Sequence, residues 1–154
     1  MKIDKEILQK AERYCAKAER SPYDVKLFLQ KRDVKSEAII TEIINRLKAN
    51  NFLNEERYIK AFIHDKFKLN KWGKYKIKLA LLAKGFGEEK IEKCMAETID
   101  PNEYIDTLKN IMEKKKKTLK IGNRNILKQK ISNFAVSKGY EPGLVKKIVE
   151  SIMN

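Results

Sequence analysis

The sequence has few of the residues on which catalytic and metal sites are usually built. Its 154 residues include one histidine and two cysteines. His64 has no second histidine and no serine or cysteine neighbour, so neither a metal site nor a nucleophile pair is indicated. Cys15 and Cys94 lie too far apart in the sequence for metal-ligand spacing or a local redox pair. We therefore expect two buried free thiols, and no catalytic residue, metal, cofactor or enzyme activity.

Glycine, proline and long apolar runs are also scarce. There are six glycines and three prolines, and the stretch KGFGEEK at 84–90 lacks the Gly-Lys-Ser/Thr ending of a phosphate-binding loop. No apolar run approaches the ~20 residues that cross a bilayer, and no signal peptide precedes Asp4. We expect a cytoplasmic monomer without membrane contact.

Charged and helix-favouring residues are abundant instead. Lysine, glutamate, isoleucine and leucine dominate, 36% of the residues are charged and 42% are hydrophobic, a composition that favours helix and suffices for a core. The net charge of +14 attracts polyanions or acidic protein surfaces. We expect an all-α protein with an anionic partner, nucleic acid being the first to consider.

One pattern of apolar residues occurs three times along the chain. Residues 74–91 align with residues 24–39 and 128–145, at spacings of 52 and 54 residues. Gly85 and Gly139 occupy one position of the pattern, where glycine ends a helix in the left-handed conformation at no steric cost. Asp33 takes this position in the first stretch, and aspartate is among the few other residues that adopt this conformation readily.

An earlier helix precedes each of these stretches. Tyr58, Ala61 and Phe62 have helical spacing in the middle one, and helix starts are predicted at Ser21-Pro22, Asn54 and Asp100-Pro101. These features predict three tandem three-helix repeats, at residues 1–51, 52–100 and 101–154. Since one such unit has a small core, neighbouring repeats should pack into an elongated, curved array.

Two long stretches contain lysine or arginine but no acid. In the first, between Asp65 and Glu88, the residues Lys71, Lys74 and Lys78 have a spacing that places them on one helix face, opposite Ile77 and Leu81. With no acid nearby, each of the three lysines should be uncompensated. The face either is simply solvated or holds an anionic partner.

The second stretch runs from 114 to 138 and includes four consecutive lysines, which cannot all lie on one side of a helix. Some of them must flank the core, or the helix frays there. Both stretches suggest one continuous basic surface. Trp72 either stacks on a base or partner residue, or wedges into a helix joint. The candidate residues for binding a partner or DNA are Arg57, Lys68, Lys71, Lys74, Lys76, Lys78, Lys84, Lys114, Lys115, Lys116, Lys117, Lys120, Arg124, Lys128 and Lys130, with Trp72 for stacking.

The middle third of the chain resembles the RecX family, regulators of the bacterial RecA recombinase. The matching motif reads Leu53-Asn54-Glu55-Glu56-Arg57-Tyr58-Ile59, then Gly73, Lys76-Ile77, Leu81 and Lys84-Gly85-Phe86. Asn54 stands where the family favours aspartate, Ile59 where a small alanine is usual, and Leu127 replaces the third-repeat counterpart of Gly73.

The resemblance implies a non-enzymatic protein of three tandem three-helix repeats that lies in the helical groove of the RecA–DNA filament. There it would restrain strand exchange and the filament-stimulated cleavage of repressors, in homologous recombination, DNA repair and the SOS response. The alternative is a helical repeat protein that binds single-stranded nucleic acid directly, without a recombinase partner.

Overall fold

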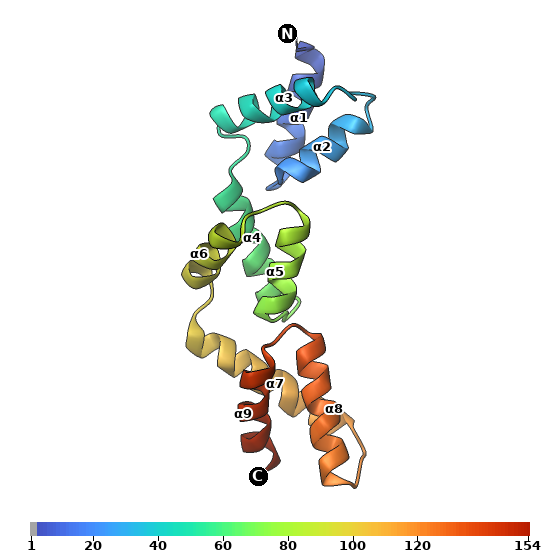
Figure 1. Cartoon of the computed structure of the whole chain (residues 1–154), viewed down its shortest axis with the longest axis vertical. Helices are drawn as coiled ribbons and strands as arrows, with labels where there is room; N and C mark the ends of the chain where they lie inside the picture. Colours follow the sequence, from blue (N-terminus) through green and yellow to red (C-terminus); the bar gives the residue numbers. More distant parts are fainter. Residues whose placement is uncertain (1–2) are drawn as a thin grey trace. The chain divides into compact units, whose positions relative to one another are not determined.

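The computed structural model describes residues 3–154, so the first two residues of the predicted repeat 1–51 lie outside the described part. Within residues 3–154 there are nine helices and no strand, and the helices cover more than two thirds of the chain (Figure 1). The predicted all-α helical repeat fold is confirmed. The helices are α1 (Lys5–Lys17), α2 (Pro22–Gln30), α3 (Glu37–Ala49), α4 (Glu55–Lys68), α5 (Lys74–Ala83), α6 (Glu88–Thr98), α7 (Pro101–Thr118), α8 (Arg124–Ser137) and α9 (Pro142–Met153).

The chain forms two compact units, Met1–Ala61 and Phe62–Asn154, and the boundary falls within α4. The division into three repeats at 51/52 and 100/101 stays a prediction. The helix starts predicted from the sequence are present in both units. Ser21 and Asp24 form a capping box, Asn54 Oδ1 accepts the Arg57 backbone N–H at 2.9 Å, and the Asp100 side chain caps α7.

The first unit is built around α2, which packs against α1 and α3. Its core contains Ala11 and Cys15 of α1, Val25 and Leu29 of α2, and buried residues of α3 and the segment after it, Ile40, Ile43, Leu47 and Leu53. Cys15 is a buried free thiol, as predicted, and burial raises its pKa to about 11. Cys94 is likewise buried and free.

The turn after the second helix of each predicted repeat has the same geometry. Asp33, Gly85 and Gly139 have φ values of 64°, 91° and 104°, which confirms the left-handed conformation predicted for all three. The next residue donates its backbone N–H to the carbonyl five residues before it, in the bonding pattern of a helix C-terminus closed by a left-handed residue. These bonds are Val34 to Leu29, Phe86 to Leu81 and Tyr140 to Ala135, at 3.0–3.3 Å.

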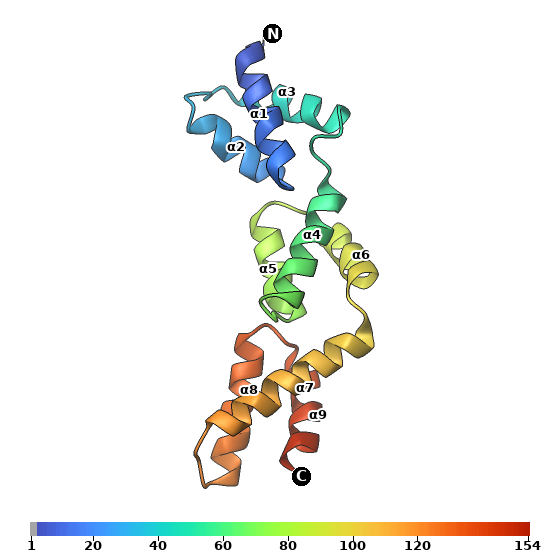
Figure 2. The same cartoon turned by 180° about the vertical axis from the view of Figure 1, so that it is seen from behind.

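In the second unit α7, α8 and α9 pack against one another, as both views show (Figures 1 and 2), and α5 packs against α6. Ile77 and Leu81 of α5 are fully buried, which confirms that they face the core. On α4 the buried side chains are, from its start onward, Tyr58, Ile59, Ile63 and Phe67, whereas Ala61 and Phe62 are half-buried. The predicted apolar face of α4 is therefore confirmed at Tyr58 and wrong at Ala61 and Phe62, which are only half-buried.

Two glycines bring the start of α5 against the turn between α8 and α9. The Gly73 backbone N–H donates to Lys138 O at 2.8 Å, and the Tyr75 backbone N–H donates to Gly139 O at 2.9 Å. A Cβ atom on Gly73 would lie 2.3 Å from the Gly139 carbonyl carbon. Position 73, one of the residues of the RecX-like motif, thus requires glycine, because the backbone of the second unit passes too close to it for a side chain.

Two buried tyrosines complete this contact. Tyr104 of α7 accepts the Lys74 backbone N–H at 2.9 Å and donates its hydroxyl to Glu141 Oε1. The Tyr140 hydroxyl donates to Lys71 O at 3.0 Å. The contact between the α4–α5 and α7–α9 segments, which we call the glycine joint, consists of these hydrogen bonds and those of Gly73 and Tyr75. It fixes the position of the chain around Lys71 relative to α7 and α8.

Candidate partner-binding surface

Lys78 is paired with two glutamates although the sequence around it contains no acid. Its Nζ lies 2.7 Å from Glu88 Oε1 and 3.0 Å from Glu92 Oε1, both on α6. Hydrogen bonding to these carboxylates raises the pKa of Lys78, and the bond from Lys78 lowers the pKa of Glu88. The prediction that Lys78 is uncompensated is wrong, because the compensating acids come from the neighbouring helix.

Lys71 and Lys74 do not share one solvated helix face with Lys78. Lys71 precedes α5 and has a φ of 59°, while α5 begins at Lys74. The Lys74 Nζ lies 4.6 Å from the centre of the Tyr104 ring, a cation–π geometry. Lys71 is exposed. The prediction of a common face is wrong for this reason: the three lysines occupy three different environments.

Three further candidate cations are compensated by acids distant in the sequence. Each such pair is partly exposed, so that its contribution to stability is small, about 0–1 kcal/mol. The hydrogen bond from one of these lysines lowers the pKa of its carboxylate partner, Glu150. The pairs are Arg57–Glu19, Lys68–Glu103 and Lys128–Glu150.

Trp72 is half-buried and lies between two cations. The Lys66 Nζ is 4.8 Å from the ring centre and the Lys76 Nζ is 4.6 Å from it. The ring therefore already makes cation–π contacts within the chain. Stacking of Trp72 on a base or partner residue stays a prediction.

The four consecutive lysines lie in the last turns of α7 and point to different surroundings. Lys115 Nζ lies 4.7 Å from the centre of the Phe134 ring, and Lys116 donates to Ile152 O at 3.0 Å near the end of α9. Lys114 and Lys117 are exposed. As predicted, the run is shared between the solvent and the flank of the core.

Residues from both basic stretches line one groove of about 430 Å³ along α7 and α8, which we call the α7–α8 groove. Lys71, Lys114, Lys115 and Lys138 line it together with the apolar side chains of Ile111 and Phe134. Lys138 also donates its Nζ proton to Asn70 O at 2.9 Å. Three separate chain segments, at residues 71, 114–115 and 138, thus present four lysines around one partly apolar groove, a combination suited to an anionic partner with an apolar part.

Other candidates lie outside this groove. Lys120 and Lys130 are exposed, Arg124 donates to Asn154 Oδ1 at 3.5 Å, and Lys84 Nζ is 6.0 Å from the centre of the Phe62 ring. None of the four lines the α7–α8 groove. The structure therefore brings together only part of the predicted surface, namely Lys71, Lys114 and Lys115.

Sequence reasoning missed a second basic groove, between α1 and α2, with a volume of about 630 Å³. Every candidate cation came from Arg57 or beyond. The signal that could have indicated this groove is the series Lys10, Arg13 and Lys17, spaced at three and four residues so that one face of α1 is basic.

The described residues hold no group of three or more histidine, cysteine, aspartate or glutamate side chains placed to bind a metal. The same part of the chain, residues 3–154, has no helix that is both long and apolar enough to span a membrane.

Comparison with known proteins gives the same family along most of the chain. Residues 54–95 match RecX, second three-helix domain. The chain is 35% identical to the regulatory protein RecX of Clostridium perfringens over 120 residues, which are 77% of this chain and 55% of that protein. It is 30% identical to the regulatory protein RecX of Halalkalibacterium halodurans over 133 residues, 86% of this chain and 49% of that protein. The chain thus spans about half the length of these curated relatives.

Solved structures show the same fold. The crystal structure of RecX from Lactobacillus salivarius has a TM-score of 0.83 at 21% identity and covers 96% of this chain and 94% of that one. A crystal structure of regulatory protein RecX has a TM-score of 0.81 at 17% identity and covers 97% of this chain and 81% of that one. At these identities the likeness concerns the fold.

Proposed function

We propose, from the premise that this chain is a RecX-family protein, as its sequence predicted and its relatives bear out, that it regulates the RecA recombinase. The regulation is inhibition: the chain binds in the helical groove of the RecA–DNA filament and restrains strand exchange and coprotease activity. The observation that carries the proposal is the similarity to regulatory RecX proteins over most of the chain.

The α7–α8 groove supports an anionic partner for this function. Lys71 and Lys114 line it, are exposed, and form no ion pair within residues 3–154. Cations that lack a local carboxylate attract phosphate or carboxylate groups of a partner and increase the association rate. The glycine joint holds Lys71 against the turn between α8 and α9, since the carbonyl of Lys71 itself accepts the hydroxyl of Tyr140 in that turn.

The test is ATP hydrolysis by RecA on single-stranded DNA with increasing amounts of this protein. We expect inhibition at stoichiometric or lower ratios, and weaker inhibition by the double variant Lys71→Glu/Lys114→Glu. The matched control is Lys146→Glu/Lys147→Glu, which changes the net charge equally at two exposed positions of α9. Equal inhibition by both double variants would place the partner surface elsewhere, and no inhibition by the unaltered protein would refute the proposed function.

The second candidate, direct binding of single-stranded nucleic acid, is favoured by the combination of lysines and the Phe134 ring in the same groove. Salt separates the two functions. If phosphate neutralisation dominates, the logarithm of the affinity for naked strands falls with the logarithm of salt concentration at a slope of about −0.7 for each phosphate neutralised. If a protein interface dominates, binding to the preformed filament survives salt that abolishes binding to DNA alone.

A further inference from the structure

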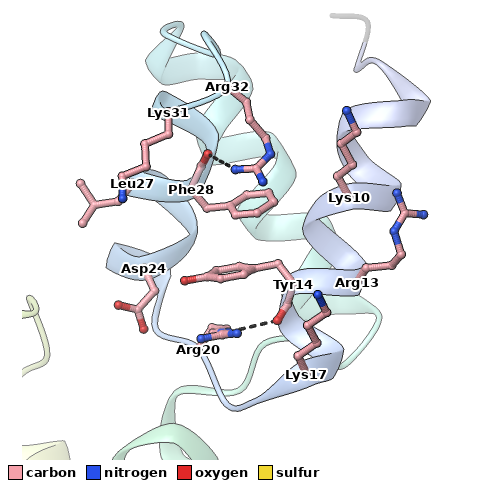
Figure 3. A pocket seen from close by; sticks show the side chains of 10 residues that line it. All are labelled: Lys10, Arg13, Tyr14, Lys17, Arg20, Asp24, Leu27, Phe28, Lys31 and Arg32. Atoms are coloured by element: carbon pink, nitrogen blue, oxygen red, sulfur yellow. Dashed lines mark hydrogen bonds between the residues drawn. The ribbon is translucent and has the colours of Figure 1, made fainter.

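The groove between α1 and α2 is lined by six cations and one acid. The cations are Lys10, Arg13 and Lys17 of α1, Arg20 of the connecting segment, and Lys31 and Arg32 after α2 (Figure 3). The acid, Asp24, accepts the Ser21 backbone N–H at 2.9 Å as part of the α2 capping box. The groove therefore concentrates positive charge within the first compact unit, and its acid is engaged in capping.

Two aromatic rings and two arginines form one stack along this groove, which we call the arginine ladder. The Tyr14 and Phe28 rings are stacked, with centroids 4.3 Å apart and planes inclined by 15°. Arg20 lies 3.9 Å from the Tyr14 ring centre and Arg32 lies 3.7 Å from that of Phe28. Figure 3 shows the four side chains in the order Arg32, Phe28, Tyr14, Arg20. The guanidinium groups thus end the ladder on both sides.

Backbone carbonyls hold each guanidinium and leave part of it available. Arg20 donates its Nε proton to Tyr14 O at 3.0 Å, which leaves both terminal nitrogens for a ligand. Arg32 donates an N–H proton of Nη1 to Phe28 O at 3.3 Å, which leaves the N–H groups of Nε and Nη2 for a ligand. Each arginine therefore keeps a pair of N–H donors suited to bidentate contact with phosphate.

The spacing of the ladder suits a repeated anion. Three successive separations of 3.9, 4.3 and 3.7 Å place the guanidinium centres at most about 12 Å apart. A nucleic-acid strand carries one phosphate per nucleotide, so that the two guanidinium groups, at most about 12 Å apart, can each contact a phosphate of the same strand. Arg13, Lys17 and Lys31 make no ion pair within residues 3–154 and flank the ladder.

We propose that the α1–α2 groove is a site for the phosphodiester backbone of a single nucleic-acid strand, separate from the α7–α8 groove. Arg20 and Arg32 bind phosphate oxygens through their remaining N–H pairs, and Lys17 and Lys31 neutralise neighbouring phosphates. An acidic peptide fits less well. Peptide binding relies on apolar anchors that fill pockets. Here both faces of each ring are already covered: Tyr14 and Phe28 cover each other on one side, and the arginines cover them on the other.

The experiment measures the affinity of the full chain for a fluorescent oligothymidylate by anisotropy over a range of salt concentrations, without RecA. Lys17→Gln/Lys31→Gln is compared with Lys5→Gln/Lys35→Gln, which removes the same charge from exposed positions of the same unit that do not line the groove. We expect the first variant to bind more weakly and its salt slope to fall by about 0.7 for each phosphate that it no longer neutralises. The second should keep the slope of the unaltered protein.

Arg32→Lys keeps the charge and removes the forked donor pair. We expect a several-fold loss of affinity with an unchanged melting curve in far-UV circular dichroism. Equal effects of the two lysine variants, or a loss confined to Lys71→Glu/Lys114→Glu, would overturn the proposal. Displacement of the oligonucleotide by oligoglutamate of equal charge at equal concentration would assign the groove to acidic peptides instead. Because RecA is absent, these outcomes are independent of the proposed regulatory function.

Discussion

Replacing Gly73 by alanine should open the glycine joint. The added Cβ would lie 2.3 Å from Gly139 C, 2.4 Å from Tyr140 N and 2.5 Å from Gly139 O. All three are backbone atoms, so that no side-chain rotation relieves the clash. The start of α5 must move away from the α8–α9 turn, and the bonds from Gly73 N–H to Lys138 O and from Tyr75 N–H to Gly139 O are stretched or broken.

The expected destabilisation follows from these two effects. Losing two hydrogen bonds costs about 1–3 kcal/mol at a net 0.5–1.5 kcal/mol each. Inserting a methyl group into a closely packed contact costs about 1–3 kcal/mol more. The Gly73→Ala variant should therefore lose about 2–6 kcal/mol of unfolding free energy, a large share of the roughly 5–15 kcal/mol typical of a domain.

The assay is urea denaturation followed by circular dichroism, with Gly87→Ala as the matched control. Gly87 is the N-cap of α6, as Gly73 is of α5, but a Cβ on Gly87 would meet no atom within 4 Å. We expect the control to lose about 1 kcal/mol or less, since alanine is a poor N-cap. If the two variants unfold within half a kcal/mol of each other, the close backbone contact at Gly73 does not stabilise the second unit.

Three further predictions concern buried groups. Leu81→Ala should cost about 2–5 kcal/mol through reduced burial and a cavity, because Leu81 is fully buried; a change within half a kcal/mol in chemical denaturation would contradict this. Tyr104→Phe should cost about 1–3 kcal/mol, because it leaves Lys74 N–H and the Glu141 carboxylate without their partner; unchanged thermal unfolding would show that water replaces the hydroxyl. Cys15, whose pKa burial raises to about 11, should stay a thiol in the folded state while an unfolded thiol ionises near its ordinary pKa of about 8.5. The free energy of unfolding should then fall as pH rises from about 9 toward 11, and a thiol reagent at pH 8 should label Cys15 quickly only in urea; fast labelling of the folded protein would contradict its burial.

The helices and their ends could be predicted from the sequence because these features are local. The side chains of Ser21 and Asp100 each cap a helix start by accepting the backbone N–H three residues on. The left-handed turns at Asp33, Gly85 and Gly139 follow from which residues tolerate a positive φ. The inward side of α5 followed from the spacing of Ile77 and Leu81. On α4 the same reasoning was right for Tyr58 but wrong for Ala61 and Phe62, since a helix with apolar residues on several sides does not reveal which side its neighbours cover.

The electrostatic environment of the lysines could not be predicted in the same way. Lys78 stands in a stretch without acids, yet the turn at Gly85 returns the chain so that Glu88 and Glu92 reach it. Lys68 and Lys128 are likewise paired with glutamates that the fold brings close to them, 35 and 22 residues further along the chain. Local charge imbalance predicts a basic region, but which cations remain unpaired depends on tertiary contacts. The arginine ladder likewise depends on the packing of α1 on α2, which places Tyr14 against Phe28.

RecA regulation is best tested by strand exchange between homologous DNA molecules, catalysed by RecA with the unaltered protein added to preformed filaments. We expect joint-molecule formation to fall with increasing protein and to stop at or below one copy per RecA subunit. The protein should also sediment with the filament at salt concentrations that release it from naked single strands. Full strand exchange in the presence of excess protein, with no protein in the filament pellet, would contradict inhibition of RecA by this chain.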